Sequence, residues 1–187
     1  MKRESKHAAA RARIGVSACL LGERVRYDGG HKRARALTRR LEELVEWVRV
    51  CPETEMGLGV PREPMNLVGE NGEHRLKTRE TKTDHTDAMR AYAQERIASL
   101  ARENLCGFIL KSRSPSCGLE GVPVYDASGR AVSRARGFFT AALLERFPDL
   151  PIEEETRLAD PRIFRKWMER VFAYRERQER KRRLSKL

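Results

Sequence analysis

The sequence lacks any apolar run near the roughly 20 residues that a membrane-spanning helix needs. Its N-terminus, MKRESKHAAARAR, has no apolar stretch like that of a signal peptide. These two absences predict a protein without a membrane partner and without an export signal. The 187 residues, 40% of them hydrophobic, suffice for the core of one ordinary domain. We therefore expect a cytoplasmic protein with one compact domain and charged appendages.

A CxxC pair is also absent. The chain has only four cysteines, and they are widely separated: Cys19, Cys51, Cys106 and Cys117. Such spacing is unlike the disulfide framework of a small secreted fold. In a reducing compartment, cysteines that share a site are better explained by metal binding or catalysis. The few histidines show no ligand spacing toward the cysteines: His7, His31, His74 and His85.

The excess of positive charge is confined to two segments. The formal net charge is +12, of which residues 1–13 contribute +4 and residues 157–187 contribute +8. Residues 14–156 carry 22 basic and 22 acidic side chains. Basic ends of this kind suit RNA or another phosphate-rich partner. A solvated arm and a charged helix extension explain the same composition, so the charge alone leaves both interpretations open.

Short β-branched runs alternate with helical patterns along the chain. The expected strands are RIGVSAC, VRVC, CGFILKS and PIEEE, at residues 13–19, 48–51, 106–112 and 151–155. The expected helices are 36–47, a long helix opening at Asp84, 137–147 and a last helix starting at Asp160-Pro161. This alternation implies right-handed crossovers and helices on both faces of a sheet. We predict an α/β fold, a three-layer αβα sandwich with a mostly parallel, Rossmann-like sheet.

Several weaker patterns complete the expected layout. Residues 66–82 read as a small hairpin around NGEH, and residues 122–126 as a short edge strand. In the last helix an apolar stripe predicts core packing: Phe164, Trp167, Met168, Val171 and Phe172. Beyond Tyr174 the helix becomes almost wholly charged, and we expect it to project into solvent.

The predicted strands sort the four thiols. In open parallel sheets, ligands bind outside the carboxyl ends of the strands. Cys19 and Cys51 end the first and second strands, and Cys117 lies in the SPSCG turn after the third. We therefore expect these three to meet at one edge of the sheet. Cys106 opens the third strand instead, so it reads as a small buried hydrophobe.

Three converging thiolates invite a metal, and the sequence narrows which one. A zinc site would need a fourth protein ligand, for which only His31 lies close enough in the chain. An iron-sulfur cluster is normally held by four cysteines, so three would leave one iron without a protein ligand. Three unrelated buried cysteines remain the alternative that spacing alone does not exclude.

The residues beside these cysteines favour a working site. Glu53, behind Pro52, would place a carboxylate beside the metal in position for proton transfer, although a surface glutamate is the plainer interpretation. Ser114 and Ser116 are placed to hydrogen-bond a substrate or cluster sulfurs, and Ser-Pro-Ser is also ordinary turn chemistry. Lys111 and Arg113 would supply positive charge for an anionic substrate.

Several ordered motifs resemble the thiouracil desulfidase family, namely SACLLGERVRYDGGHK, VCPETEMGLGVPREPMNLV and FILKSRSPSCG. EMGLGVPREP and LPIEEETRLADP are similar to the longer subgroup of that family, which removes sulfur from 4-thiouridine in tRNA. The likeness covers about residues 14–173. It divides the chain into a basic arm at 1–13, a desulfidase-like domain at 14–173 and a basic helical extension at 174–187.

The resemblance implies an iron-sulfur-dependent enzyme. It implies a 4Fe-4S cluster held by Cys19, Cys51 and Cys117, with one iron not bound by protein. It also implies hydrolytic removal of sulfur from a thiolated uracil, which yields uracil and sulfide. The acid/base carboxylate of the family falls on Glu53 and its helper hydroxyl on Ser114, before Ser116.

One difference from the tRNA-linked subgroup leaves three possibilities for how the substrate is presented. Members of the tRNA-linked subgroup usually carry a second C-terminal domain, and this chain stops just after the desulfidase domain. Either a separate tRNA-binding protein replaces it, or the basic termini contact tRNA, or the substrate is a free thiolated base or nucleoside. Two rival functions also stand: a non-enzymatic metal- or cluster-containing RNA-binding module, and a zinc-stabilised structural domain.

Overall fold

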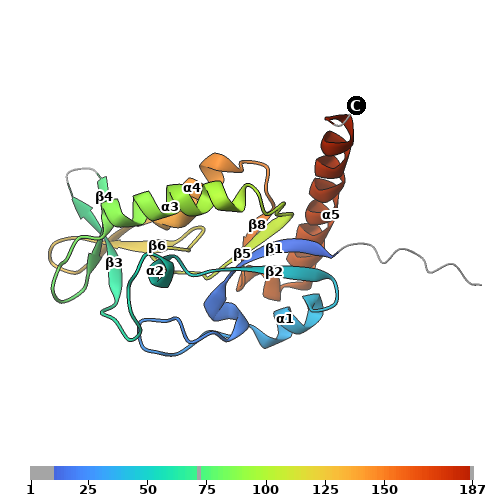
Figure 1. The fold of residues 1–187 in the computed structure, drawn as a ribbon. Coiled ribbons are helices and arrows are strands. Elements are labelled where there is room, and N and C mark those ends of the chain that lie inside the picture. Colours follow the sequence, from blue (N-terminus) through green and yellow to red (C-terminus); the bar gives the residue numbers. More distant parts are fainter. Residues whose placement is uncertain (1–10, 71–72, 186–187) are drawn as a thin grey trace, which may run out of the picture.

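A computed structural model describes residues 11–70 and 73–185, and its first sheet is wholly parallel (Figure 1). Its strand order is β2-β1-β5-β8, with bounds Val45–Val50, Ala12–Ser17, Gly107–Leu110 and Ile152–Glu154. All six residues of β1 pair in parallel with β2. The alternating pattern of the sequence therefore produced the parallel sheet that we predicted.

Helices cover both faces of this sheet. One apolar cluster joins β1 to α1 (Arg35–Leu41) and α5 (Pro161–Leu184), with Trp167 fully buried at its centre. A second cluster joins the other face to α3 (Thr86–Leu100) and α4 (Phe138–Arg146). The three-layer αβα prediction is thereby confirmed. Among the described residues, no helix combines the length and apolar composition of a bilayer span.

A second sheet lies beside the first, with order β4-β3-β6-β7 and bounds Glu73–Thr78, Met65–Glu70, Val122–Tyr125 and Ala131–Ala135. The predicted hairpin at 66–82 is confirmed as β3 and β4. The predicted strand at 122–126 is confirmed as β6, but its predicted edge position was wrong, because β6 pairs with β3 on one side and β7 on the other. The sequence analysis missed β7, whose residues are almost all exposed and show no apolar alternation.

The predicted helix at 36–47 was too long. The helix ends at Leu41, and Val45–Val50 form β2 instead. Leu37, Leu41, Val45 and Val48 fit a helical spacing, but β1 offers the β-branched residues a full set of ladder hydrogen bonds, and that pairing prevails. The long helix predicted from Asp84 begins at Thr86, although the Asp84 carboxylate does accept the N–H of that residue at 2.8 Å.

Three short helical elements follow strands of the first sheet, and the long helix α5 is the last element of the fold. These short elements are η1 (Ala18–Leu21), α2 (Pro52–Glu55) and η2 (Arg157–Ala159). As predicted, the Asp160 carboxylate caps α5 by accepting the N–H groups of Arg162 and Ile163. The predicted apolar stripe is buried at Trp167, whereas Phe172 is 42% exposed. Figure 1 shows the end of α5 projecting past the sheet, and residues 1–10 of the predicted basic arm lie outside the described residues.

Candidate functional site

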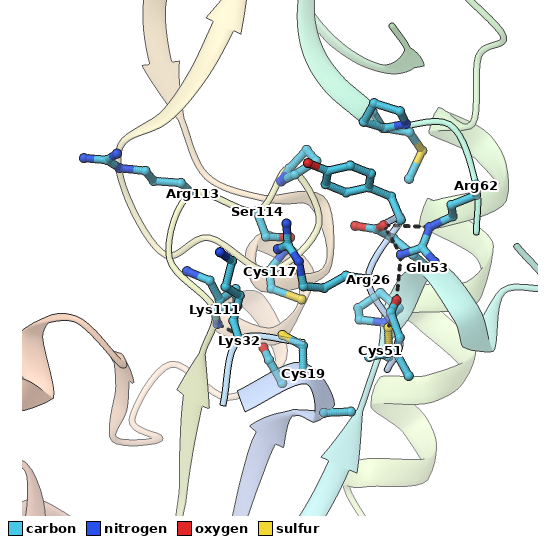
Figure 2. A pocket seen from close by; sticks show the side chains of 18 of the residues that line it. Cys19, Arg26, Lys32, Cys51, Glu53, Arg62, Lys111, Arg113, Ser114 and Cys117 are labelled. Atoms are coloured by element: carbon cyan, nitrogen blue, oxygen red, sulfur yellow. Dashed lines mark hydrogen bonds and ion pairs between the residues drawn. The ribbon is translucent and has the colours of Figure 1, made fainter. Parts of the chain in front are cut away.

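Three cysteines meet at the carboxyl edge of the first sheet, as the strand order predicted. Cys19 lies in η1 just after β1, Cys51 forms the N-cap of α2 just after β2, and Cys117 lies in the turn after β5. All three line one cavity of about 370 Å³ (Figure 2). Cys106 is buried at the other end of β5 and does not line this cavity. The structure thus brings together the three thiols that sequence reasoning grouped and separates the one that it set aside.

The thiols of Cys19 and Cys117 are costly to ionise in the absence of a positive partner. Burial, reinforced by the nearby Cys51, raises the pKa of Cys19 to about 12. Burial likewise raises the pKa of Cys117 well above its ordinary range, while a hydrogen bond with Ser17 acts in the opposite direction. A metal centre would reverse this preference, since a bound cation deprotonates its thiol ligands.

The donor set fits a cluster better than a single ion. Among the described residues, no three Cys, His, Asp or Glu side chains lie close enough together to hold one metal ion. His31, the one candidate for a fourth zinc ligand, does not line the cavity, and its Nδ1 accepts the N–H of Arg33 at 3.2 Å. A cluster gives each thiolate its own iron, so its ligands lie farther apart than those of a single ion. Three thiols line this one cavity, and no fourth cysteine and no histidine of the described residues lines it, which suits that requirement.

The carboxylate of Glu53 is held at the cavity wall by two partners. Its Oε2 accepts from both Nε and Nη2 of Arg62, at 3.0 and 2.5 Å. Its Oε1 accepts from the Ser116 hydroxyl at 2.9 Å. The pair is well shielded, with side-chain exposures of 16% for Glu53 and 9% for Arg62 (Figure 2). A bidentate guanidinium fixes the orientation of a carboxylate as well as its charge.

The two serines of the SPSCG turn have different positions. Ser114 lines the cavity, and its Oγ accepts the N–H groups of Ser116 at 3.3 Å and Cys117 at 3.1 Å. Ser116 is fully buried behind the wall, where it reaches Glu53. The sequence predicted both serines as site residues but did not predict that only Ser114 faces the cavity. Turns have no regular alternation of side-chain direction, so the sequence of this turn gave no sign of the difference.

Close packing fixes the same turn from behind. The N–H of Gly137 donates to the carbonyl of Gly118 at 2.9 Å. A Cβ on Gly137 would lie only 2.5 Å from the carbonyl oxygen of Ser116. Glycine is therefore required where α4 approaches the turn that carries Cys117. Residues 119–136, which include β6 and β7, leave and return to the fold at this one point.

Two consecutive glutamates at the end of β8 fasten the segment from β5 to the turn. Glu155 accepts from the backbone N–H of Ser112 at 2.7 Å and pairs with the Lys111 ammonium at 2.6 Å. Glu154 accepts the backbone N–H of Leu119 at 2.9 Å. Sequence reasoning identified PIEEE as a strand but missed this role; the available signal was three consecutive carboxylates at a strand end that the fold buries.

Sequence reasoning also missed most of the positive charge in the cavity. Six basic side chains line it, against Glu53 as the one acidic residue among the lining residues: Arg26, Lys32, Arg62, Arg79, Lys111 and Arg113. Arg26 pairs with Asp28 at 3.4 Å. Within the described ranges, three of the six form no ion pair, and all three are exposed: Lys32, Arg79 and Arg113. The cavity therefore has an inner wall of thiols and a carboxylate and an outer rim of free cations.

Comparisons with known proteins agree with this geometry. A model of the 2-thiouracil desulfurase family matches residues 14–155. The uncharacterised protein YbbK of Bacillus subtilis (strain 168) is 34% identical over 138 residues, which are 71% of this chain and 89% of that protein. The solved structure of the [4Fe-4S]-dependent thiouracil desulfidase TudS superposes with a TM-score of 0.61 at 32% identity, covering 80% of this chain and 94% of that one.

Proposed function

The chain belongs to the 2-thiouracil desulfurase family, and we propose that it is a desulfidase that hydrolytically removes sulfur from a thiolated uracil, giving uracil and sulfide. The observation that carries this proposal is the convergence of Cys19, Cys51 and Cys117 with Glu53 on one cavity. Thiols alone would suit a structural metal. A carboxylate held beside them in a space open to a ligand adds the means to move a proton.

We propose Cys19, Cys51 and Cys117 as the ligands of a 4Fe-4S cluster that has one iron not bound by protein. The cofactor of TudS and the donor set of this cavity support that assignment. When bound, such a cluster supplies a soft Lewis acid suited to a sulfur leaving group. Mg²⁺ prefers oxygen ligands, so it is poorly suited to the same task.

In this proposal Glu53 takes the proton from the water that replaces sulfur. A carboxylate oxygen has two lone-pair sites, and the Oε1 of Glu53 uses one of them for Ser116. The other site remains for a water in the cavity. Arg62 holds Oε2, so the carboxylate points in one direction and needs no reorganisation as the proton moves. Ser116 and Arg62 are thus positioning residues in this scheme.

Ser114 is placed to bind the substrate. Its Oγ accepts two backbone N–H groups, which occupy both lone pairs, so the hydroxyl proton is left to donate. That proton faces acceptors on a bound pyrimidine, because Ser114 lines the cavity. The hydroxyl would orient the ring so that its thiocarbonyl carbon faces the water near Glu53.

The rim favours a substrate that carries phosphate. A volume of about 370 Å³ lies in the usual range of ligand pockets and accommodates a base with its ribose. Lys32, Arg79 and Arg113, the cations without ion pairs among the described residues, line the same cavity and suit phosphate oxygens. Both a free thiouridine nucleotide and 4-thiouridine in tRNA meet this description. For tRNA we propose that the basic termini add contacts of their own.

An anaerobic assay tests the function. The brown protein, purified without oxygen, should release sulfide from 4-thiouridine or 2-thiouracil and yield the sulfur-free base in equal amount. Iron and labile sulfide without turnover on any thiolated uracil would favour the RNA-binding module. Zinc without iron would favour the structural domain.

A further inference from the structure

Arginines from the two basic segments of the chain lie together at the amino edge of the first sheet. Arg11 and Arg13 lie at the start of β1, and Arg175 and Arg182 lie on the second half of α5. These four arginines line one hollow of about 170 Å³, whose wall also includes Cys106. Two arginines from each end of the described chain therefore share one surface.

Two of the four arginines are paired with glutamates. Arg13 pairs with Glu46 at 3.2 Å and with Glu103 at 2.7 Å, and Arg175 pairs at 2.8 Å with Glu179, the one acidic residue among the described residues that line the hollow. Arg11 and Arg182 form no ion pair within the part of the chain that the structure describes.

The charge continues beyond the hollow. Arg182 and Gln178 also line a second hollow of about 320 Å³ on α5, together with Arg146. Residues 180–183 read RKRR, and all four side chains are exposed. We call the region around the two hollows the amino-edge surface, with these members: Arg11, Arg13, Arg146, Arg175 and Arg182. Adjacent like charges repel one another, so a polyanion bound here would relieve that repulsion.

We infer that the amino-edge surface binds the phosphate backbone of an RNA that carries the thiolated base, an inference that rests on the proposed function. Guanidinium groups from the start of β1, from α4 and from α5 suit a row of phosphates. The surface lies at the opposite end of β1 from Cys19, and six residues at about 3.3 Å each separate the two by about 20 Å. A free nucleotide is too short to contact both, whereas a folded RNA spans this distance.

The experiment measures the affinity of the holoenzyme for an unmodified tRNA transcript over a range of salt concentrations. The double variant Arg11→Gln/Arg182→Gln removes two cations that lack ion-pair partners, so it leaves no orphaned carboxylate. It should bind tRNA more weakly and reduce the slope of log affinity against log salt by about 2. Sulfide release from free thiouracil should stay at the wild-type rate.

The double variant Arg35→Gln/Arg39→Gln is the matched control. It removes the same charge from two exposed arginines of α1 that form no ion pair among the described residues, and it should keep the wild-type slope. Equal slopes for the two double variants would overturn the inference. Binding of polyglutamate or anionic vesicles as tightly as tRNA would overturn RNA as the partner. Loss of tRNA binding in a protein that releases no sulfide would support the surface and refute the proposed function.

Discussion

Both edges of the first sheet contain cysteines and arginines, but these side chains have different partners at each edge. At the carboxyl edge, thiols line a cavity, and Glu53 and Glu155 each hold a cation at its wall. At the amino edge, Cys106 is alone among arginines, two of which have no ion pair within the described ranges. In a parallel sheet every strand ends at the same edge, so loops from distant parts of the chain meet there. The proposed catalytic site and the proposed RNA-binding surface thus lie at opposite edges of the same sheet.

The largest expected difference between the edges is in iron. Cys117→Ser should lower iron and labile sulfide to background and abolish sulfide release, because a hydroxyl replaces one of the three proposed ligands and Cys106 does not line the cavity to take its place. Cys106→Ser is the matched control and should retain both iron and activity. Anaerobic metal analysis and the visible spectrum measure this. If Cys117→Ser kept its full iron content, the assignment of ligands would be wrong.

The next effect separates proton transfer from cluster binding at the carboxyl edge. Glu53→Gln keeps the shape of the side chain but removes its basicity, so kcat should fall about 10²- to 10⁴-fold. Iron content should stay at the wild-type level, since Glu53 is not among the proposed ligands. Single-turnover sulfide release on protein of known iron content measures this. A variant with wild-type turnover would remove Glu53 from the mechanism.

A smaller effect concerns how firmly the thiol turn is fastened. Glu155→Gln leaves the Lys111 ammonium without its carboxylate and weakens the bond to the Ser112 N–H, so the free energy of unfolding should fall by about 2–3 kcal/mol. Urea denaturation of the apoprotein measures this value. Glu145→Gln, on the exposed side of α4, should change it by less than about 0.5 kcal/mol. Equal losses of unfolding free energy in both variants would argue against a role of the Glu155 contacts in fastening the turn.

The smallest effect tests whether α5 is a passive connection between the edges. Asp160→Ala removes the N-cap of α5 and should lower the free energy of unfolding by about 1 kcal/mol. The cap is far from the cavity lining, so turnover of free thiouracil should not change. A marked loss of activity would show that the position of α5 matters to the thiols.

Sequence reasoning succeeded where the chain follows a regular pattern. The positions of Cys19, Cys51 and Cys117 after three strands predicted their convergence, since that conclusion needs only strand polarity. It failed at residues 42–47, where apolar spacing fits a helix and a strand alike and pairing with β1 decides between them. Short-range pattern carries no information about that partner.

Side-chain partners across the fold were harder to foresee. Arg62 follows Glu53 by nine residues in an irregular loop, and nothing in the local sequence pairs them. The meeting of Arg11 with Arg182 depends on the path of α5, whose second half lies beside the start of β1. Composition gave the charge of both segments, but only the three-dimensional path places Arg11 and Arg13 beside Arg175 and Arg182.

The contact between Gly118 and Gly137 has a practical consequence for protein engineering. Because the intervening excursion starts and finishes at a shared point, its outer bend near Ser128 and Gly129 can be lengthened without pulling on the sulfur-bearing turn. A fluorophore or an affinity tag inserted there would leave the cavity that the three thiols line at its native dimensions.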